Sequence, residues 1–105
     1  MQIRVNTDNH IEGSSRMENY FDNVIQEKLK RFEERITNLE VYLADENSSD
    51  KKGTDDKRCT IEAHITGIKP LAVTNHADTV EKSVLGAISK MKTLLEHTFD
   101  KIKTH

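Results

Sequence analysis

The chain has 105 residues, of which 34% are hydrophobic and 32% charged, and its formal net charge is −2. This length predicts one domain over residues 1–105 with a single lean core, and the charge excludes a protein that is basic over its whole surface. No apolar run approaches the ~20 residues of a membrane span, the N-terminus lacks a signal-peptide pattern, and the single cysteine cannot form an internal disulfide. We therefore expect a soluble, cytoplasmic protein that does not bind membranes.

The N-terminal third predicts a strand followed by a long helix. Residues 2–6 alternate apolar and polar side chains, as a half-buried strand does. The segment 13–15 begins a helix, in which Ser15 and Glu18 have the spacing of a capping box. Apolar residues then recur at intervals of three and four to about Arg35, so one amphipathic helix is expected. This stripe contains Met17, Tyr20, Phe21, Val24, Ile25, Leu29 and Phe32.

The middle of the chain predicts three further strands. Alternation returns over residues 39–44, 59–66 and 71–76. Residues 45–56 contain no large apolar side chain and predict a flexible polar loop or hairpin tip. A turn at residues 67–70 would let the apolar sides of the last two strands coincide, which favours a hairpin.

The last third predicts a second long helix, with Asp78 as its N-cap and Glu81 three residues later. Its apolar stripe contains Val80, Val84, Ala87, Ile88, Met91, Leu95 and Ile102. A right-handed crossover makes the first two strands parallel, and the others follow as an antiparallel meander. Because each helix carries one apolar stripe, the expected fold class is α+β. It is a two-layer β-α-β-β-β-α sandwich, with a four-stranded mixed sheet and both helices on one face.

The sequence contains no catalytic or metal-binding motif. A Gly-rich phosphate loop, G-x-S-x-G, H-E-x-x-H and C-x-x-C are all absent. Cys59 and His64 fall on opposite faces of one predicted strand, so Cys59 is interpreted as a small core residue. The five histidines lack ligand spacing. We therefore expect no enzymatic activity, no cofactor, no metal and no small-molecule substrate.

Basic residues gather on the two predicted helices. They are Lys28, Lys30, Arg31 and Arg35 on the first helix and Lys82, Lys90, Lys92, His97, Lys101 and Lys103 on the second. Parallel neighbouring helices would bring the two sets onto one outer face, with a groove able to hold phosphates. Carboxylates such as Glu27, Glu96 and Asp100 share these helices, so the mixed charge of any exposed helix is the competing interpretation. Tyr42 and Phe99 are the aromatic rings left for base stacking.

Five segments have a distinctive order and spacing along the chain. They are the opening residues 1–3, the pattern K-x-x-R-F-x-x-R-I over residues 28–36, the strand 39–43, the pattern A-I-x-K-M-K over residues 87–92 and the ending at residues 100–105. Together they resemble the ribosome hibernation-promoting factors, also called ribosome-associated inhibitors or sigma-54 modulation proteins, in their short single-domain form.

The resemblance implies the same order of elements and a role in stressed or resting cells. Such a protein binds the small ribosomal subunit at its decoding region, in the channel of messenger and transfer RNA, and blocks translation without a cofactor or a reaction. Contacts to ribosomal RNA would come from Lys28, Arg31, Arg35, Lys90, Lys92, Lys101 and Lys103. The dense basic cluster that typical members carry in the last helix is replaced here by residues 93–99. We expect no dimerising domain of the kind that long members carry, so pairing of ribosomes would need a separate protein.

A second hypothesis stays open, in which the same fold is a protein-interaction module in stress regulation and does not bind RNA. It would use the acidic loop or exposed strands, and it predicts sensitivity to loop deletion and indifference to the helix lysines. A third hypothesis, an enzyme with a cryptic site, needs a pocket that so small a core hardly has the volume to form.

Overall fold

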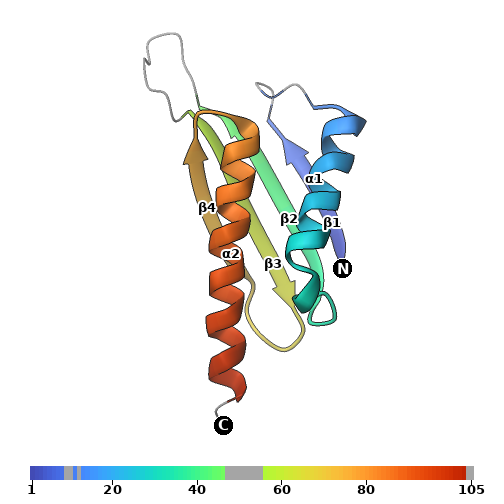
Figure 1. The fold of residues 1–105 in the computed structure, drawn as a ribbon, viewed down its shortest axis with the longest axis vertical. Helices are drawn as coiled ribbons and strands as arrows, with labels where there is room; N and C mark the ends of the chain where they lie inside the picture. Colours follow the sequence, from blue (N-terminus) through green and yellow to red (C-terminus); the bar gives the residue numbers. More distant parts are fainter. Residues whose placement is uncertain (9–10, 12, 47–55, 104–105) are drawn as a thin grey trace.

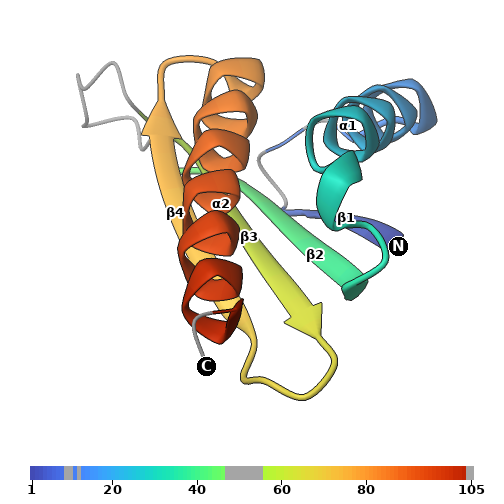
Figure 2. The same cartoon turned by 60° about the horizontal axis from the view of Figure 1, so that its bottom comes forward.

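The computed structural model describes residues 1–8, 11, 13–46 and 56–103. The elements in chain order are β1 (Gln2–Thr7), α1 (Ser15–Lys28), the 3-10 helix η1 (Lys30–Phe32), β2 (Ile36–Asp45), β3 (Lys57–Ile65), β4 (Leu71–Ala77) and α2 (Val80–Lys103). The sheet has the order β1-β2-β3-β4, with β1 parallel to β2 and the other neighbours antiparallel. Both helices cover the same face of the sheet and run in the same direction (Figures 1 and 2). The predicted two-layer α+β architecture is therefore confirmed.

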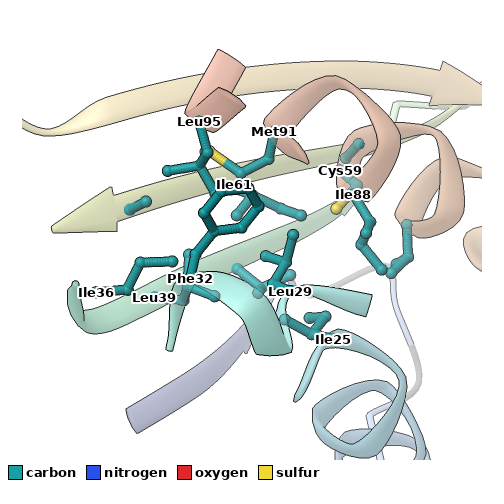
Figure 3. Packing of buried hydrophobic residues seen from close by; sticks show 14 of the residues in the cluster. Ile25, Leu29, Phe32, Ile36, Leu39, Cys59, Ile61, Ile88, Met91 and Leu95 are labelled. Carbon is teal, nitrogen blue, oxygen red and sulfur yellow. The ribbon is translucent and has the colours of Figure 1, made fainter. Parts of the chain in front are cut away.

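The strand register gathers the apolar side chains on the face that the helices cover. Leu39 pairs with Ala63 and Val41 pairs with Ile61 across β2 and β3, and all four are fully buried. Ile61 pairs with Val73 on β4, so the turn after β3 aligns the apolar sides as predicted. Figure 3 shows this core between the sheet and the helices; its labelled members are Ile25, Leu29, Phe32, Ile36, Leu39, Cys59, Ile61, Ile88, Met91 and Leu95.

The first helix is shorter than predicted, and a tighter turn replaces its last two turns. α1 ends at Lys28, and the Phe32 N–H then donates to the Leu29 carbonyl at 2.9 Å, in the i to i+3 pattern of a 3-10 helix. Side chains three residues apart are eclipsed in this geometry, so Leu29 and Phe32 both enter the core, with 0% and 4% exposure. After this turn, β2 begins at Ile36, which is buried.

The helix caps lie next to the predicted residues. The Ser14 hydroxyl, not that of Ser15, accepts from the Met17 N–H at 3.1 Å, and α1 begins at Ser15. The Thr79 hydroxyl, not the Asp78 carboxylate, accepts from the Lys82 N–H at 3.1 Å before α2. Serine, threonine and aspartate are all good N-caps, so adjacent candidates differ too little for the sequence to separate them.

The second helix packs closely on β4. A Cβ atom at Gly86 would lie 2.1 Å from Nδ2 of Asn75, and this Nδ2 donates to the Ser83 carbonyl at 3.3 Å. Farther along, Lys90 Nζ donates to the Thr74 carbonyl of β4 at 2.8 Å. Glycine thus lets α2 approach the β4 edge of the sheet, on the side away from α1 (Figure 1).

The ends of the predicted polar loop are joined by strand pairing. Asp45 is the last residue of β2, and the Glu46 N–H donates to the Asp56 carbonyl at 2.7 Å. Residues 47–55 lie outside the described residues, so the flexibility expected of this loop stays a prediction. Within the described part of the chain, no helix is long and apolar enough to cross a membrane.

Candidate nucleic-acid interface

A hollow of about 470 Å³ opens between α1 and α2. It is lined by Glu27, Lys28, Leu85, Ile88, Ser89 and Lys92. Leu85, Ser89 and Lys92 follow one another at intervals of three and four, so they line one side of α2, facing α1. Lys28 and Lys92 come from different helices, and neither makes an ion pair with any residue that the structure describes. Two ammonium groups at one hollow are therefore open to an anion.

Tyr20 links the two helices near the start of α2. Its hydroxyl donates to Oε2 of Glu81 at 2.5 Å, and this bond raises the pKa of Tyr20. The prediction that Tyr20 belongs to the core is wrong, because its side chain is 47% exposed. Adjacent helical residues point about 100° apart, and here the neighbouring Phe21 takes the core position, with 4% exposure.

A second hollow, of about 250 Å³, lies where η1 meets the last turns of α2. Two arginines stack there on two phenylalanines. The Arg31 guanidinium carbon lies 4.9 Å from the Phe32 ring centroid, and that of Arg35 lies 4.2 Å from the Phe99 centroid. The two ring centroids are 5.6 Å apart. Stacking on a ring holds a guanidinium in one plane, which prepares its N–H groups for bidentate contact with an anion.

The interpretation of Phe99 as a spare ring for base stacking is corrected by this packing. Its side chain is 6% exposed and lies between Phe32 and Arg35, so it supports an arginine and presents no free face. Tyr42 is 44% exposed, but it lies on the sheet face opposite the helices. Neither ring adds a base-stacking platform to the helix side of the molecule.

The two arginines of this hollow differ in their acidic neighbours. Arg31 Nη1 lies 3.1 Å from Oε2 of Glu96 on α2, with side-chain exposures of 62% and 39%. Arg35 makes no ion pair with any residue in the described ranges. From the sequence, Glu96 was interpreted only as part of the mixed charge of the helices, and neither ring support was predicted. The adjacency of Arg31 to Phe32, and the three-residue spacing of Glu96 and Phe99, were the available signals.

Five other predicted contact residues, all with described side chains, do not line either hollow. Lys90 is two residues from Lys92, roughly 200° around the helix, and bonds to β4. Lys82 pairs with Asp78 at 3.2 Å, one helical turn away. The other three described side chains are exposed; they are those of Lys30, His97 and Lys101. Lys103 is the last residue of α2, and its side chain lies outside the described part of the structure.

The open face of the sheet also carries cations, but carboxylates hold them. Arg4 lies 3.7 Å from Glu40, and Arg58 lies 3.1 Å from Glu46. On the same face Glu46 also contacts His76 at 2.9 Å, and Glu62 contacts His64 at 2.7 Å; neither histidine is counted as a cation.

Two further expectations concern metals and the cysteine. Within the described residues, no three histidine, cysteine, aspartate or glutamate side chains gather closely enough to hold a metal ion. Cys59 is fully buried on the core face of β3, and this burial raises the pKa of its thiol to about 12. A thiol with this pKa is protonated near neutral pH and is a poor nucleophile, which agrees with its interpretation as a core residue.

Together, these observations define a two-layer α+β domain whose two hollows along the helices are lined by four basic side chains and three carboxylates. Residues 4–103 match the family described as sigma 54 modulation protein / S30EA ribosomal protein. The match spans nearly the whole chain, so the protein belongs to this family, and the resemblance seen in the sequence is confirmed. The family comprises non-enzymatic ribosome modulation proteins.

Solved structures agree with this assignment at the level of the fold. The N-terminal domain of Protein Y from Thermus thermophilus superimposes with a TM-score of 0.71 at 15% identity, over 93% of this chain and 99% of that one. A ribosomal subunit interface protein from Coxiella burnetii gives a TM-score of 0.70 at 16% identity, over 95% of this chain and 99% of that one. No curated protein matches the chain.

Proposed function

We propose that this protein is a hibernation factor that binds the small ribosomal subunit at its decoding region. There it occupies the channel of messenger and transfer RNA and so inhibits translation during stress or stationary phase. Membership of the sigma 54 modulation family supports a ribosomal role, and one protein of the same fold is described as a ribosomal subunit interface protein.

The two hollows between the first and the last helical segments are together called the helix groove. The observation that carries the proposal is the placement of unpaired cations along this groove. Lys28 and Lys92 flank the larger hollow, and Arg35 lies at the smaller one. None of these three makes an ion pair with a residue that the structure describes. A net charge of −2 is compatible with RNA binding because the local field depends on which cations are free, not on their sum.

The groove suits recognition of an RNA backbone better than recognition of bases. The groups that could bind RNA there are the ammonium groups of lysines and the guanidinium groups of arginines, and the nearby rings of Phe32 and Phe99 are buried. Phosphate contacts position a protein on RNA without reading its sequence, whereas base contacts specify it. We therefore expect the folded shape of the ribosomal RNA, not a short sequence, to determine the site.

Co-sedimentation with purified small ribosomal subunits across a salt series tests the proposal. With phosphate contacts from the unpaired Lys28, Arg35 and Lys92, the logarithm of the binding constant should fall against the logarithm of salt concentration with a slope of about 2 to 3. Transfer RNA should compete for the same site. Absence of binding at low salt, or binding that ignores both salt and transfer RNA, would contradict the proposal.

A protein-interaction module remains the second candidate, and the open sheet face is the observation that favours it. Tyr42 is 44% exposed there, beside Asn6 and Thr60 in the register. Replacing Tyr42 with serine and deleting residues 47–55 should leave ribosome binding unchanged if the helix groove is the interface. Loss of binding in either variant would favour this second candidate.

A further inference from the structure

In the smaller hollow, Arg31 forms an ion pair with Glu96, whereas Arg35 has no acidic partner among the described residues. This difference suggests that a carboxylate of the groove competes with RNA. We infer that Glu96 competes with RNA phosphate for Arg31 and thereby lowers the affinity of the groove for the ribosome. This inference rests on the proposed function and concerns the regulation of that same site. It makes Glu96 a residue that sets affinity without contacting RNA.

The contact geometry shows why the carboxylate and a phosphate exclude each other. Glu96 Oε2 lies 3.1 Å from Arg31 Nη1, which is one of the donors a bidentate phosphate would use. Stacking on Phe32 limits how far the guanidinium can turn to offer its other edge. A phosphate close to Arg31 must therefore displace Glu96 or accept repulsion from its charge.

The exposure of the pair makes this exchange possible without unfolding. Arg31 is 62% exposed and Glu96 39% exposed, so RNA can reach the pair directly. Exposed ion pairs contribute little to folding stability, since water screens them and long side chains lose entropy when they pair. Breaking the ion pair between Arg31 and Glu96 should therefore leave the domain folded and the guanidinium N–H groups of Arg31 free to bind phosphate.

Asp100 provides a matched control in the same hollow. It lies one helical turn after Glu96 and lines the hollow with it, but it makes no ion pair with any described residue. Glu96→Gln and Asp100→Asn remove the same charge from the same place. Only the first variant also frees a guanidinium donor of Arg31.

The experiment measures binding of the full chain to purified small ribosomal subunits across a salt series. We expect Glu96→Gln to tighten binding about fivefold at low salt and Asp100→Asn at most about twofold, because only Glu96 holds Arg31. The salt slope should steepen by about 0.7 to 0.9 in Glu96→Gln alone, as one more phosphate contact forms. In an Arg31→Gln background, the two variants should give equal gains.

Three results would overturn the inference. Equal gains and equal slopes in the two single variants would show a general effect of charge. A Glu96→Gln variant that binds no more tightly than wild type, while its thermal unfolding is unchanged, would show that Glu96 does not compete. If wild type itself fails to bind the subunits at low salt, the proposed function fails first and the inference falls with it.

Discussion

The helix groove and the open face of the sheet carry similar charged residues but arrange them differently. On the sheet, register sets each cation beside a carboxylate, as Arg4 is beside Glu40. Along the groove, Lys28, Arg35 and Lys92 make no ion pair with described residues, and Arg31 is the one groove cation with a carboxylate partner. Counting charges along the sequence cannot show this difference, because it depends on which residues become neighbours when the sheet and helices form.

The difference lies in pairing and not in the number of charges. The arginines of the open sheet face are each cancelled by a neighbouring carboxylate, so the field along the helices depends on the charges that line the two hollows themselves, four cations and three carboxylates. Variants of each face can test whether pairing or position decides which face binds the ribosome.

Reversing the groove cations should give the largest effect. Lys28→Glu, Arg35→Glu and Lys92→Glu combined should weaken binding to small ribosomal subunits about a hundredfold or more at low salt, because three phosphate contacts become repulsions. The salt slope should fall by about 2 to 3. Loss of the stacking of Arg35 on Phe99 should lower the free energy of unfolding by about 0.5 to 1 kcal/mol, and the exposed Lys28 and Lys92 should add little to this.

The matched control reverses cations of the open sheet face. Arg4→Glu and Arg58→Glu combined introduce charge changes of the same kind on the opposite layer of the molecule. We expect binding to stay within about threefold of wild type, because the long-range effect of these charges is screened at physiological salt. Losses in proportion to the number of reversed charges, three along the groove and two on the sheet, would mean that total charge, not the groove, governs binding.

The position of the second helix beside the groove should depend on Gly86. A methyl group there would lie 2.1 Å from Nδ2 of Asn75, so Gly86→Ala must shift α2 or displace Asn75 from Ser83. We expect a loss of about 1 to 2 kcal/mol in the free energy of unfolding, because overpacking outweighs the better helix propensity of alanine. Urea denaturation measures this loss.

Ser89→Ala is the control for that substitution, since Ser89 is exposed on the same helix. It should change stability by less than about 0.5 kcal/mol. Combining Gly86→Ala with Asn75→Ala should recover part of the loss, because the clash disappears with the amide. Strict additivity of the two single losses would show that the contact between Gly86 and Asn75 is not the cause.

The fold could be predicted from the sequence because periodicity reports which face of each element is buried. The alternation of residues 59–66 and 71–76 with a turn between them predicted a hairpin with its apolar sides together, and the pairing of Ile61 with Val73 agrees with this. The end of the first helix could not be predicted. The spacing of Leu29 and Phe32 fits both an α-helix and the tighter turn, and contact with the rest of the core decides between them.

The candidate site could be predicted only as a set of basic residues on two helices. Whether Lys90 faces the groove depends on the rotation of α2, which its contact with Thr74 on β4 reveals. The ring support of Arg35 joins residues from two separate elements, so no local pattern contains it. Long-range side-chain contacts of this kind arise from packing and leave no periodic signal in the sequence.

The buried side of the sheet predicts a pH effect that the open side does not share. Burial raises the pKa of Cys59 from 9.0 to about 12 in the folded state. Between these two pKa values the folded chain keeps the thiol proton and the unfolded chain loses it. The contribution of the buried thiol to the free energy of unfolding is therefore fully present below pH 9 and is lost toward pH 12. Compared with Cys59→Ala, the wild type should lose about 1.4 kcal/mol more on going from pH 7 to 10.

Chemical denaturation of both proteins at each pH measures the difference, in which other titrating groups cancel. The same burial predicts that a thiol reagent labels native Cys59 far more slowly than it labels the urea-unfolded chain. Equal pH slopes for the wild type and Cys59→Ala, together with rapid native labelling, would place the thiol in contact with water.

The smallest expected effect comes from releasing a cation on the open sheet face. Glu46 accepts from Arg58 at 3.1 Å and contacts His76 at 2.9 Å, and these side chains are 36–48% exposed. A double-mutant cycle between Arg58→Gln and Glu46→Gln should give a coupling below about 1 kcal/mol in unfolding free energy, because solvent screens the pair. Glu46→Gln also frees Arg58, as Glu96→Gln frees Arg31, but on the face that we expect to point away from RNA. Its affinity for small ribosomal subunits should therefore stay unchanged; a gain equal to that of Glu96→Gln would mean that any unpaired cation recruits RNA, wherever it lies.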